Sequence, residues 1–342
     1  MSVSDSPTPP LDDVSGRLLQ LFTGFVVTQA LHAAAALEVP DLVADGPVPI
    51  ADLAERSGAH PEALDRLLRT LAGYGVFAEV SPGQFGPTAL SRALETDAAG
   101  SMRPYIFWLG EVTYSAFREL EHSVRTGQPA FEQVFGASLF DYMRANPDQG
   151  AKFDAAMAAT SVGRVAGLFD RDWSDAATVI DVGGGNATIM RELLAREPQL
   201  RGAVFDQPQA VGGAVAMIAA DGLSDRCACI PGDFFAEVPS GFDVYLLSQI
   251  LHDWDDERAT AILRNCRTAI PQHGRLVILD QVIPPGDAPH PGKILDMIML
   301  VATDGGRERS EPQWATLLEN AGFTIERIGP SGRSGIIECR PV

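Results

Sequence analysis

The stretch VIDVGGGNATI, Val179 to Ile189, decides the fold: an apolar strand runs into three consecutive glycines before a helix begins. Glycine lets the backbone pass close to a ligand and presents amide N–H groups at a helix start. The spacing excludes a P-loop, because no Gly-Lys-Ser/Thr follows. It also departs from the dinucleotide fingerprint, because Thr188 stands in place of the third glycine. A tight turn with a purely structural role is the alternative.

Working outward, the chain from Ala177 onward alternates between strands and helices. The expected strands are TVIDVGG, RGAVFDQ, CACIPGDFF, FDVYLLSQIL and GRLVILDQVI. Helical periodicity marks segments between them and EPQWATLLENAGF after them. This alternation predicts an α/β fold, a Rossmann-like doubly wound and mostly parallel sheet with helices on both faces. Ligands in such folds bind beyond the carboxyl ends of the strands.

Two of these strands are followed by acidic residues. Asp206 closes AVFD, 23 residues after Gly183, about the distance at which an acid meets the ribose hydroxyls of a nucleoside. Asp233 and Phe234 follow CACIPG, and a carboxylate beside an aromatic ring suits an adenine. Each acid alone is also explained as a solvated loop residue, so the glycine turn and the acids together carry the prediction of a nucleoside site.

A histidine ends the strand DVYLLSQIL. His252 is followed at once by Asp253 and Trp254, and it stands where the ligand crevice is expected. Asp280 in VILDQV and Glu308 in GGRE are candidate partners at corresponding ends. Because carboxylates fix the tautomer and basicity of an imidazole, we predict that His252 takes a proton from a hydroxyl. The five other histidines have no such setting.

The first half of the chain is predicted to be helical. Residues 49–94 have the outline of a winged helix, with two helices followed by a hairpin at GVFAEVSPGQFGPT. Nine acidic residues against four arginines over residues 41–100 argue against DNA binding, so an assembly module is favoured. The aromatic-rich helices of residues 101–170 are either core or the wall of an apolar pocket.

The totals set further limits. With 26 basic and 45 acidic residues the net charge is −19, which disfavours nucleic acids and anionic membranes as partners. The four cysteines lack zinc spacing, and free thiols fit the cytoplasm, where we expect the protein. The first residues have neither the basic nor the apolar region of a signal peptide, so we expect none there. The uncharged run Leu18 to Leu37 is interpreted as a helix buried in a core or a subunit interface, not as a membrane span.

Taken together, the motifs DVGGGN, FDQP, GDFF, ILHDWDDERATAILRNCRTAIP, DMIML, GGRERSEPQW and AGF resemble one family. It is the S-adenosylmethionine-dependent O-methyltransferases of the plant caffeic acid/flavonoid type, with their actinomycete antibiotic-tailoring relatives. HDWDDE with GGRERS at this spacing is the most specific part. The helical first half is similar to that family's dimerisation domain. The resemblance therefore implies a homodimer, S-adenosylmethionine as cofactor and an aromatic small molecule as acceptor.

The resemblance also assigns roles to individual residues. His252 would be the general base, with Asp280 and Glu308 beside it and with no metal involved. The implied cofactor site comprises Gly183, Gly184, Gly185, Asp206, Gln207, Asp233, Phe234 and Ser248. The implied acceptor site comprises Met157, Asp253, Trp254, Met299 and Thr303.

The chain departs from the family pattern at four positions. Ala187 replaces a glycine and could crowd the methionine tail of the cofactor, Gln207 replaces a leucine, and Ser248 stands where plant members have a lysine. Asp280 replaces a glutamate. None of these changes removes the proposed base. Which of Asp280 and Glu308 orients His252 is left open.

The sequence therefore predicts three segments: a winged-helix-like dimerisation domain (11–100), a helical linker that contributes to the substrate pocket (101–172) and a catalytic domain (173–342). The predicted reaction is metal-independent transfer of a methyl group to a phenolic hydroxyl. A relative that binds the cofactor but catalyses hydroxylation or cyclisation is the alternative, and a dehydrogenase and a transcriptional regulator are weaker ones. The acceptor, the position methylated and an oxygen, nitrogen or sulfur acceptor atom are left open.

Overall fold

The computed structural model describes residues 14–161, 163 and 165–342. The chain divides into two compact units, the first ending at Gly110 and the second beginning at Glu111. The helical segment predicted for residues 101–172 crosses this division. The predicted limits of the three segments stay a prediction, and residues 11–13, 162 and 164 lie outside the described residues.

The first unit contains the predicted pair of helices and hairpin. Pro82 and Gly83 form the hairpin turn, and Gly83 has the positive φ of 71° that such a turn requires. A short strand adds to the hairpin, so that the sheet order is β1-β3-β2. The elements are α1 (Val14–Phe22), α2 (Gly24–Ala36), α3 (Val39–Leu42), β1 (Val48–Pro49), α4 (Ile50–Ser57), α5 (Pro61–Gly73), β2 (Phe77–Ser81), β3 (Gln84–Pro87), α6 (Ala89–Arg92) and α7 (Arg103–Trp108).

The uncharged run near the N-terminus is not buried all round. It forms two helices separated at Thr23, and α1 has no buried residue. Helix α2 buries Ala30, Ala34 and Ala35. The prediction was a helix buried in a core or a subunit interface; α1 is not part of the core of the chain, and burial in an interface stays a prediction. By length and composition alone the described run Val14–Ala36 is long and apolar enough to cross a membrane, with 17% of its most apolar window buried.

The second unit begins with helices, as predicted for residues 101–170. A five-residue π-helix, η1 (Leu109–Thr113), joins the two units in sequence. The helices that follow are α8 (Tyr114–Phe117), α9 (Leu120–Thr126), α10 (Ala130–Phe135), α11 (Leu139–Ala145), α12 (Pro147–Ser161) and α13 (Ala166–Phe169).

A seven-stranded sheet forms the centre of the second unit, in the order β11-β12-β8-β7-β4-β5-β6. The five strands expected from the sequence are parallel, and β12 and β11 add an antiparallel hairpin at one edge. The strands are β4 (Thr178–Val182), β5 (Arg201–Asp206), β6 (Cys227–Pro231), β7 (Val244–Ser248), β8 (Arg275–Leu279), β11 (Phe323–Ser331) and β12 (Ser334–Pro341). Strands β9 (Val282–Ile283) and β10 (Arg309–Ser310) form a separate parallel pair.

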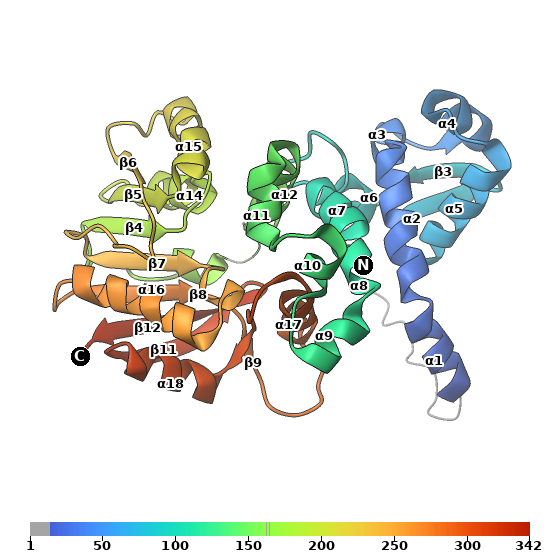
Figure 1. The fold of residues 1–342 in the computed structure, drawn as a ribbon. Helices are drawn as coiled ribbons and strands as arrows, with labels where there is room; N and C mark the ends of the chain where they lie inside the picture. Colours follow the sequence, from blue (N-terminus) through green and yellow to red (C-terminus); the bar gives the residue numbers. More distant parts are fainter. Residues whose placement is uncertain (1–13, 162, 164) are drawn as a thin grey trace. The chain divides into compact units, whose positions relative to one another are not determined.

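Helices cover both faces of this sheet (Figure 1). Alternate residues of each strand point to opposite faces. Ile180 packs with α16 and α18, whereas Val179 packs with α14 and α15. The helices are α14 (Thr188–Arg196), α15 (Pro208–Ala220), α16 (Asp256–Ala269), α17 (Pro291–Ala302) and α18 (Glu311–Asn320), with a 3-10 helix, η2 (Leu251–Asp253).

Strand β4 lies where the connections change direction. The next two strands, β5 and β6, continue to one side of β4, and β7 and β8 continue to the other. A ligand crevice is expected between the carboxyl ends of two such neighbouring strands. The glycine turn follows β4 and the His252 turn follows β7, so the fold brings both sequence motifs to this point.

Candidate active site

Three segments far apart in sequence bring His252, Asp280 and Glu308 together. His252 lies on η2 just after β7, Asp280 directly follows β8, and Glu308 directly precedes β10. The three residues are buried, with exposed fractions of 5%, 0% and 3%. The structure thus confirms that the three predicted catalytic residues are neighbours, and their roles are taken up below.

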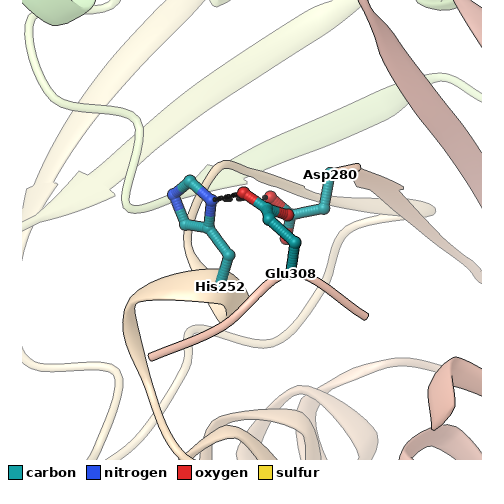
Figure 2. A group of neighbouring side chains, drawn as sticks. All are labelled: His252, Asp280 and Glu308. Atoms are coloured by element: carbon teal, nitrogen blue, oxygen red, sulfur yellow. Dashed lines mark hydrogen bonds and ion pairs between the residues drawn. The ribbon is translucent and has the colours of Figure 1, made fainter. Parts of the chain in front are cut away.

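The imidazole of His252 faces the two carboxylates with one nitrogen only (Figure 2). Its Nδ1 lies 2.6 Å from Oε1 of Glu308 and 3.8 Å from Oδ1 of Asp280. Because an ionised carboxylate can only accept, Nδ1–H donates to Glu308 and Nε2 is left as the basic nitrogen. Of the two carboxylates, Glu308 is the one within hydrogen-bond distance of the ring.

Charge makes this imidazole a strong base. Burial by itself lowers the pKa of His252, but the carboxylates of Glu308, Asp253 and Asp280 raise it more, to about 10. Burial raises the pKa of Asp280 to about 7, although the neighbouring imidazole lowers it in part. The cluster therefore holds a proton more tightly than free histidine does.

The same three residues have the composition of a metal site. Their ligand atoms lie within 4.8 Å of one another, whereas the sequence showed no such cluster. Two ligands of one divalent ion stand about 3 Å apart or more, because each lies at least about 2 Å from the ion. The 2.6 Å between His252 and Glu308 is instead a hydrogen-bond distance. The geometry favours a hydrogen-bonded base, and metal independence stays a prediction.

Neighbouring residues contact the side chain of Asp280 and the backbone of Glu308. Nε2 of Gln249 donates to Oδ1 of Asp280 at 2.8 Å, and the backbone N–H of Glu308 donates to Oδ1 of Asp296 on α17 at 2.8 Å. Gln249 has a φ of 56°, in the left-handed region that costs a non-glycine residue about 1 kcal/mol or more. This strained residue lies three positions before His252. Sequence reasoning missed both supporting residues, since neither stands in a recognisable pattern.

Asp253 and Trp254 differ in their surroundings. Oδ1 of Asp253 lies 3.6 Å from Nε2 of His252, on the basic side of the ring, and burial raises its pKa to about 6. Trp254 stacks on Phe140 of α11 and meets Phe235 edge to face. Asp253 is thus well placed to meet an acceptor, whereas Trp254 is held inside an aromatic cluster whose contact with an acceptor stays a prediction.

The glycine turn has no room for side chains at its first two positions. A Cβ at Gly183 would lie 2.4 Å from Cδ1 of Ile250, and one at Gly184 would lie 2.7 Å from Oδ2 of Asp181. Gly183 and Gly185 also have positive φ values of 79° and 54°. The close contacts and the positive φ values explain why glycine occupies these positions.

Of the two predicted acids, Asp206 contacts this turn. Asp206 accepts hydrogen bonds from the backbone N–H groups of Gly185 at 2.8 Å and Gln207 at 2.6 Å, so its carboxylate is fixed against the glycines. Burial raises its pKa, although these hydrogen bonds lower it in part. Asp233 accepts from the N–H of Phe235, and Phe234 is partly buried against the core.

Two buried polar side chains near the turn have no hydrogen-bond partner among the described residues. Both carboxylate oxygens of Asp181 and Oγ of Ser248 are in this state, at the ends of the neighbouring strands β4 and β7. Burial and the charge of Asp206 raise the pKa of Asp181 to about 7. Unpartnered buried groups of this kind suit a polar, cationic ligand. Sequence reasoning missed Asp181, although an acid inside the apolar strand TVIDV was a visible signal.

Ala187 does not point into the turn. It adopts φ 68° and ψ 14° just before α14, a conformation that explains why glycine is common at this position. Its methyl group is fully buried in the apolar cluster beneath α14 and α15. The concern that it crowds a ligand is therefore not supported.

The remaining predicted acceptor residues lie on or directly after two helices. Met299 shares a face of α17 with Asp296, which contacts Glu308. Thr303 directly follows α17, and its hydroxyl donates to the Met299 carbonyl. Met157 shares a face of α12 with Asp154, whose pKa is raised by burial and by the charge of Asp206. Both helices thus approach the site, and direct contact of these residues with an acceptor stays a prediction.

Comparison with known proteins agrees with this geometry. Residues 19–97 match the O-methyltransferase dimerisation domain, and residues 117–324 match the O-methyltransferase domain. The chain belongs to the O-methyltransferase family. As a member it is an S-adenosylmethionine-dependent O-methyltransferase with the methyltransferase fold, as the resemblance implied.

Relatives of known activity and structure support the assignment over nearly the whole chain. The phenazine O-methyltransferase of Lysobacter antibioticus is 44% identical over 96% of this chain and 97% of its own. The crystal structure of LaPhzM has a TM-score of 0.90, with 44% identity, and the match covers 96% of this chain and 99% of that one. An O-methyltransferase from neocarzinostatin biosynthesis, solved with S-adenosylmethionine and 2-hydroxy-5-methyl naphthoic acid, has a TM-score of 0.80 at 32% identity, covering 95% and 98%.

Proposed function

We propose that this O-methyltransferase moves a methyl group from S-adenosylmethionine to a phenolic hydroxyl of an aromatic or polyketide-type small molecule, with His252 as the general base. One observation carries the role of His252. Its Nδ1 is held by Glu308 at 2.6 Å, which leaves Nε2 on the opposite side of the ring to take a proton. A phenol has a reference pKa of about 10 and is mostly neutral at pH 7, so a base is useful.

The residues at the glycine turn fit the cosubstrate. S-adenosylmethionine would supply a methyl group on a sulfonium, a good leaving group that needs alignment more than activation. Asp206 would hold the ribose, Asp233 and Phe234 the adenine, and the glycines would lie along the methionine portion. We add Asp181 to this set, because its unpartnered carboxylate suits a ligand that carries positive charge.

Proton transfer then belongs to His252. As the acceptor oxygen attacks, its proton passes to Nε2, and the imidazolium is stabilised by Glu308 at short range and by Asp280 at longer range. A pKa of about 10 keeps the His252 ring protonated at pH 7 before a ligand binds. A positive charge bound beside the ring would lower this pKa and so favour release of the proton from Nε2. Oxygen is favoured over nitrogen as the acceptor atom, because a neutral amine can attack before it loses a proton.

The acceptor and the assembly are inferred from the relatives. The Lysobacter relative is named for a phenazine, and the neocarzinostatin enzyme was solved with a naphthoic acid. We therefore infer a fused-ring aromatic acceptor, and a cytoplasmic homodimer formed through residues 19–97. Exposed apolar side chains on α1 and α2 support an interface there, namely Val14, Leu18, Leu19, Leu21, Phe22, Phe25 and Val26.

A non-methylating hydroxylation or cyclisation has no observation in its favour. Its main support was Ala187, whose methyl group packs into the core. The base and both carboxylates are present, as methyl transfer requires.

An acceptor screen tests the function. The purified protein is incubated with S-adenosylmethionine and a panel of hydroxylated phenazines, naphthols and aminophenols, and the products are identified by mass spectrometry. We expect a methylated product and an equal amount of S-adenosylhomocysteine. A product that gains oxygen, or one that forms without S-adenosylhomocysteine, would instead support the alternative reaction.

A further inference from the structure

Arg309 is a buried arginine next to Glu308 in the motif GGRERS, and the proposed chemistry gives it no role. Its exposed fraction is 1%. A buried guanidinium is costly unless its donors are used, so its partners show what it stabilises.

The partners of Arg309 lie on the turn that carries His252. Nη1 donates to the Leu251 carbonyl at 2.8 Å, and Nη2 donates to the Trp254 carbonyl at 2.8 Å. Nε donates to Oδ1 of Asp256, at the start of α16, at 3.0 Å. The planar fork thus joins backbone on both sides of His252.

The neighbouring backbone adds to this hold. The backbone N–H of Arg307 donates to the His252 carbonyl at 2.8 Å. The Glu308 carboxylate accepts a hydrogen bond from Nδ1 of the His252 ring. Three consecutive residues therefore fix the backbone and the side chain of one histidine. The Arg309 side chain contacts backbone carbonyls on both sides of His252, whereas the Arg307 side chain pairs with Asp256 at 3.2 Å.

We propose that Arg309 is a positioning residue, which holds the turn Leu251–Trp254 so that the His252 ring meets Glu308. This inference rests on the proposed role of His252 as the base. Arg309 has no contact with a reacting atom in this role. It acts on rate by fixing the distance and angle of a hydrogen bond, and a displacement of about 1 Å at such a site can cost up to 100-fold.

The test compares two arginine-to-lysine variants. R309K keeps the charge but loses the fork, so it cannot reach both carbonyls. R226K is the matched control, because Arg226 also donates to backbone carbonyls, those of Leu194 at 2.9 Å and Leu200 at 3.1 Å. Arg226 stands just before β6, at the opposite end of the strands from His252.

We expect R309K to lower kcat by about 10- to 100-fold with little change in KM for S-adenosylmethionine. A looser contact with Glu308 lowers the pKa of His252, so the acidic limb of the pH–rate profile moves to lower pH. R226K should leave kcat and the profile unchanged. Equal kcat and profile in R309K and wild type would overturn the proposal.

Repeating R309K in a His252→Ala background separates positioning from general damage. If Arg309 acts through His252, the lysine changes the residual rate less than twofold. An equal loss in both backgrounds, including a loss from misfolding, would contradict the proposal.

A spectroscopic readout keeps this test separate from the proposed function. Histidine-labelled protein should show a strongly hydrogen-bonded Nδ1 proton that disappears in His252→Ala, weakens in R309K and persists in R226K. Persistence in R309K would overturn the positioning role, even if wild-type protein transferred no methyl group.

Discussion

Buried carboxylates occur at two places along the carboxyl edge of the central sheet, and their surroundings differ. Glu308 and Asp280 face an imidazole, and the first forms a 2.6 Å hydrogen bond with it. Asp181, beneath the glycine turn, has a pKa raised by burial and by the charge of Asp206, and neither of its oxygens has a hydrogen-bond partner among the described residues. Each carboxylate of the first group has one bonded oxygen and one buried oxygen, Oδ2 of Asp280 or Oε2 of Glu308, that lacks a hydrogen-bond partner among the described residues. At Asp181 both oxygens lack a partner, and we propose that a cationic ligand completes this second group.

This difference separates proton transfer from cosubstrate binding. Removing charge from the paired group should weaken catalysis, because the imidazole loses its stabilising partner. Removing charge from Asp181 should stabilise the empty protein and weaken binding, which is the usual conflict between stability and function.

The largest effect is expected at the base. We expect His252→Ala to lower kcat by about 1,000-fold, since general-base catalysis contributes about 100- to 10,000-fold. Binding of S-adenosylmethionine, measured by calorimetry, should stay within a few fold of wild type. A variant that keeps a tenth of the activity would show that the proton is taken by another group.

Glu308→Gln should cost less, about 10- to 100-fold in kcat. Because Glu308 raises the pKa of His252, its neutral replacement lowers that pKa, and the acidic limb of the pH–rate profile moves to lower pH. Asp280→Asn is the matched comparison. Because the Asp280 carboxylate lies 3.8 Å from Nδ1 of His252 and the Glu308 carboxylate lies 2.6 Å from it, Asp280→Asn should shift the acidic limb of the pH–rate profile less. A larger shift in Asp280→Asn would assign the orienting role to Asp280.

Asp181→Asn should change stability in a pH-dependent way. The folded pKa of Asp181 is raised to about 7, so the wild type loses stability as pH rises from about 4 through 7, and the variant does not. We expect a gain of about 1–3 kcal/mol in the unfolding free energy at pH 8 and little at pH 4. Urea titrations at both pH values measure this, and an equal gain at both would contradict a charge effect.

Ala187→Gly gives the smallest expected effect. Glycine removes the cost of the left-handed conformation, which stabilises the fold. It also removes a buried methyl group and makes the unfolded chain more flexible, and both changes destabilise the fold. The unfolding free energy should therefore change by about 1 kcal/mol or less. Affinity for S-adenosylmethionine should stay the same, because the methyl group packs into the core. A marked gain in affinity would show that Ala187 does reach the ligand.

The sequence predicted the elements that carry strong local signals. The parallel strands are apolar runs, and the glycine turn, His252 and Asp280 stand at the ends of such runs. Glu308 was instead singled out by the motif GGRERS. The hairpin of β11 and β12 was missed, because FTIERIGPS mixes charges, glycine and proline and lies at the sheet edge. The run that contains α1 was predicted to be buried in a core or a subunit interface, because composition alone does not distinguish a core helix from an apolar surface helix.

The support around the site could not be predicted, for a related reason. Gln249, Asp296 and Arg309 act through contacts across 12 to 58 residues of sequence, and their positions depend on tertiary packing. Asp181 was also missed, but it could have been predicted, because an acid within an apolar strand is visible in the sequence alone.

The contrast between the paired and unpaired carboxylates is tested most directly by calorimetric titration of S-adenosylmethionine at pH 7 in two buffers of different ionisation enthalpy. If a cationic ligand completes the group at Asp181, binding lowers the pKa of that carboxyl and releases protons from the wild type. Asp181→Asn should bind about 10-fold more weakly or worse and release fewer protons. Equal affinity and equal proton release in the two proteins would contradict the assignment of Asp181 to the cosubstrate site.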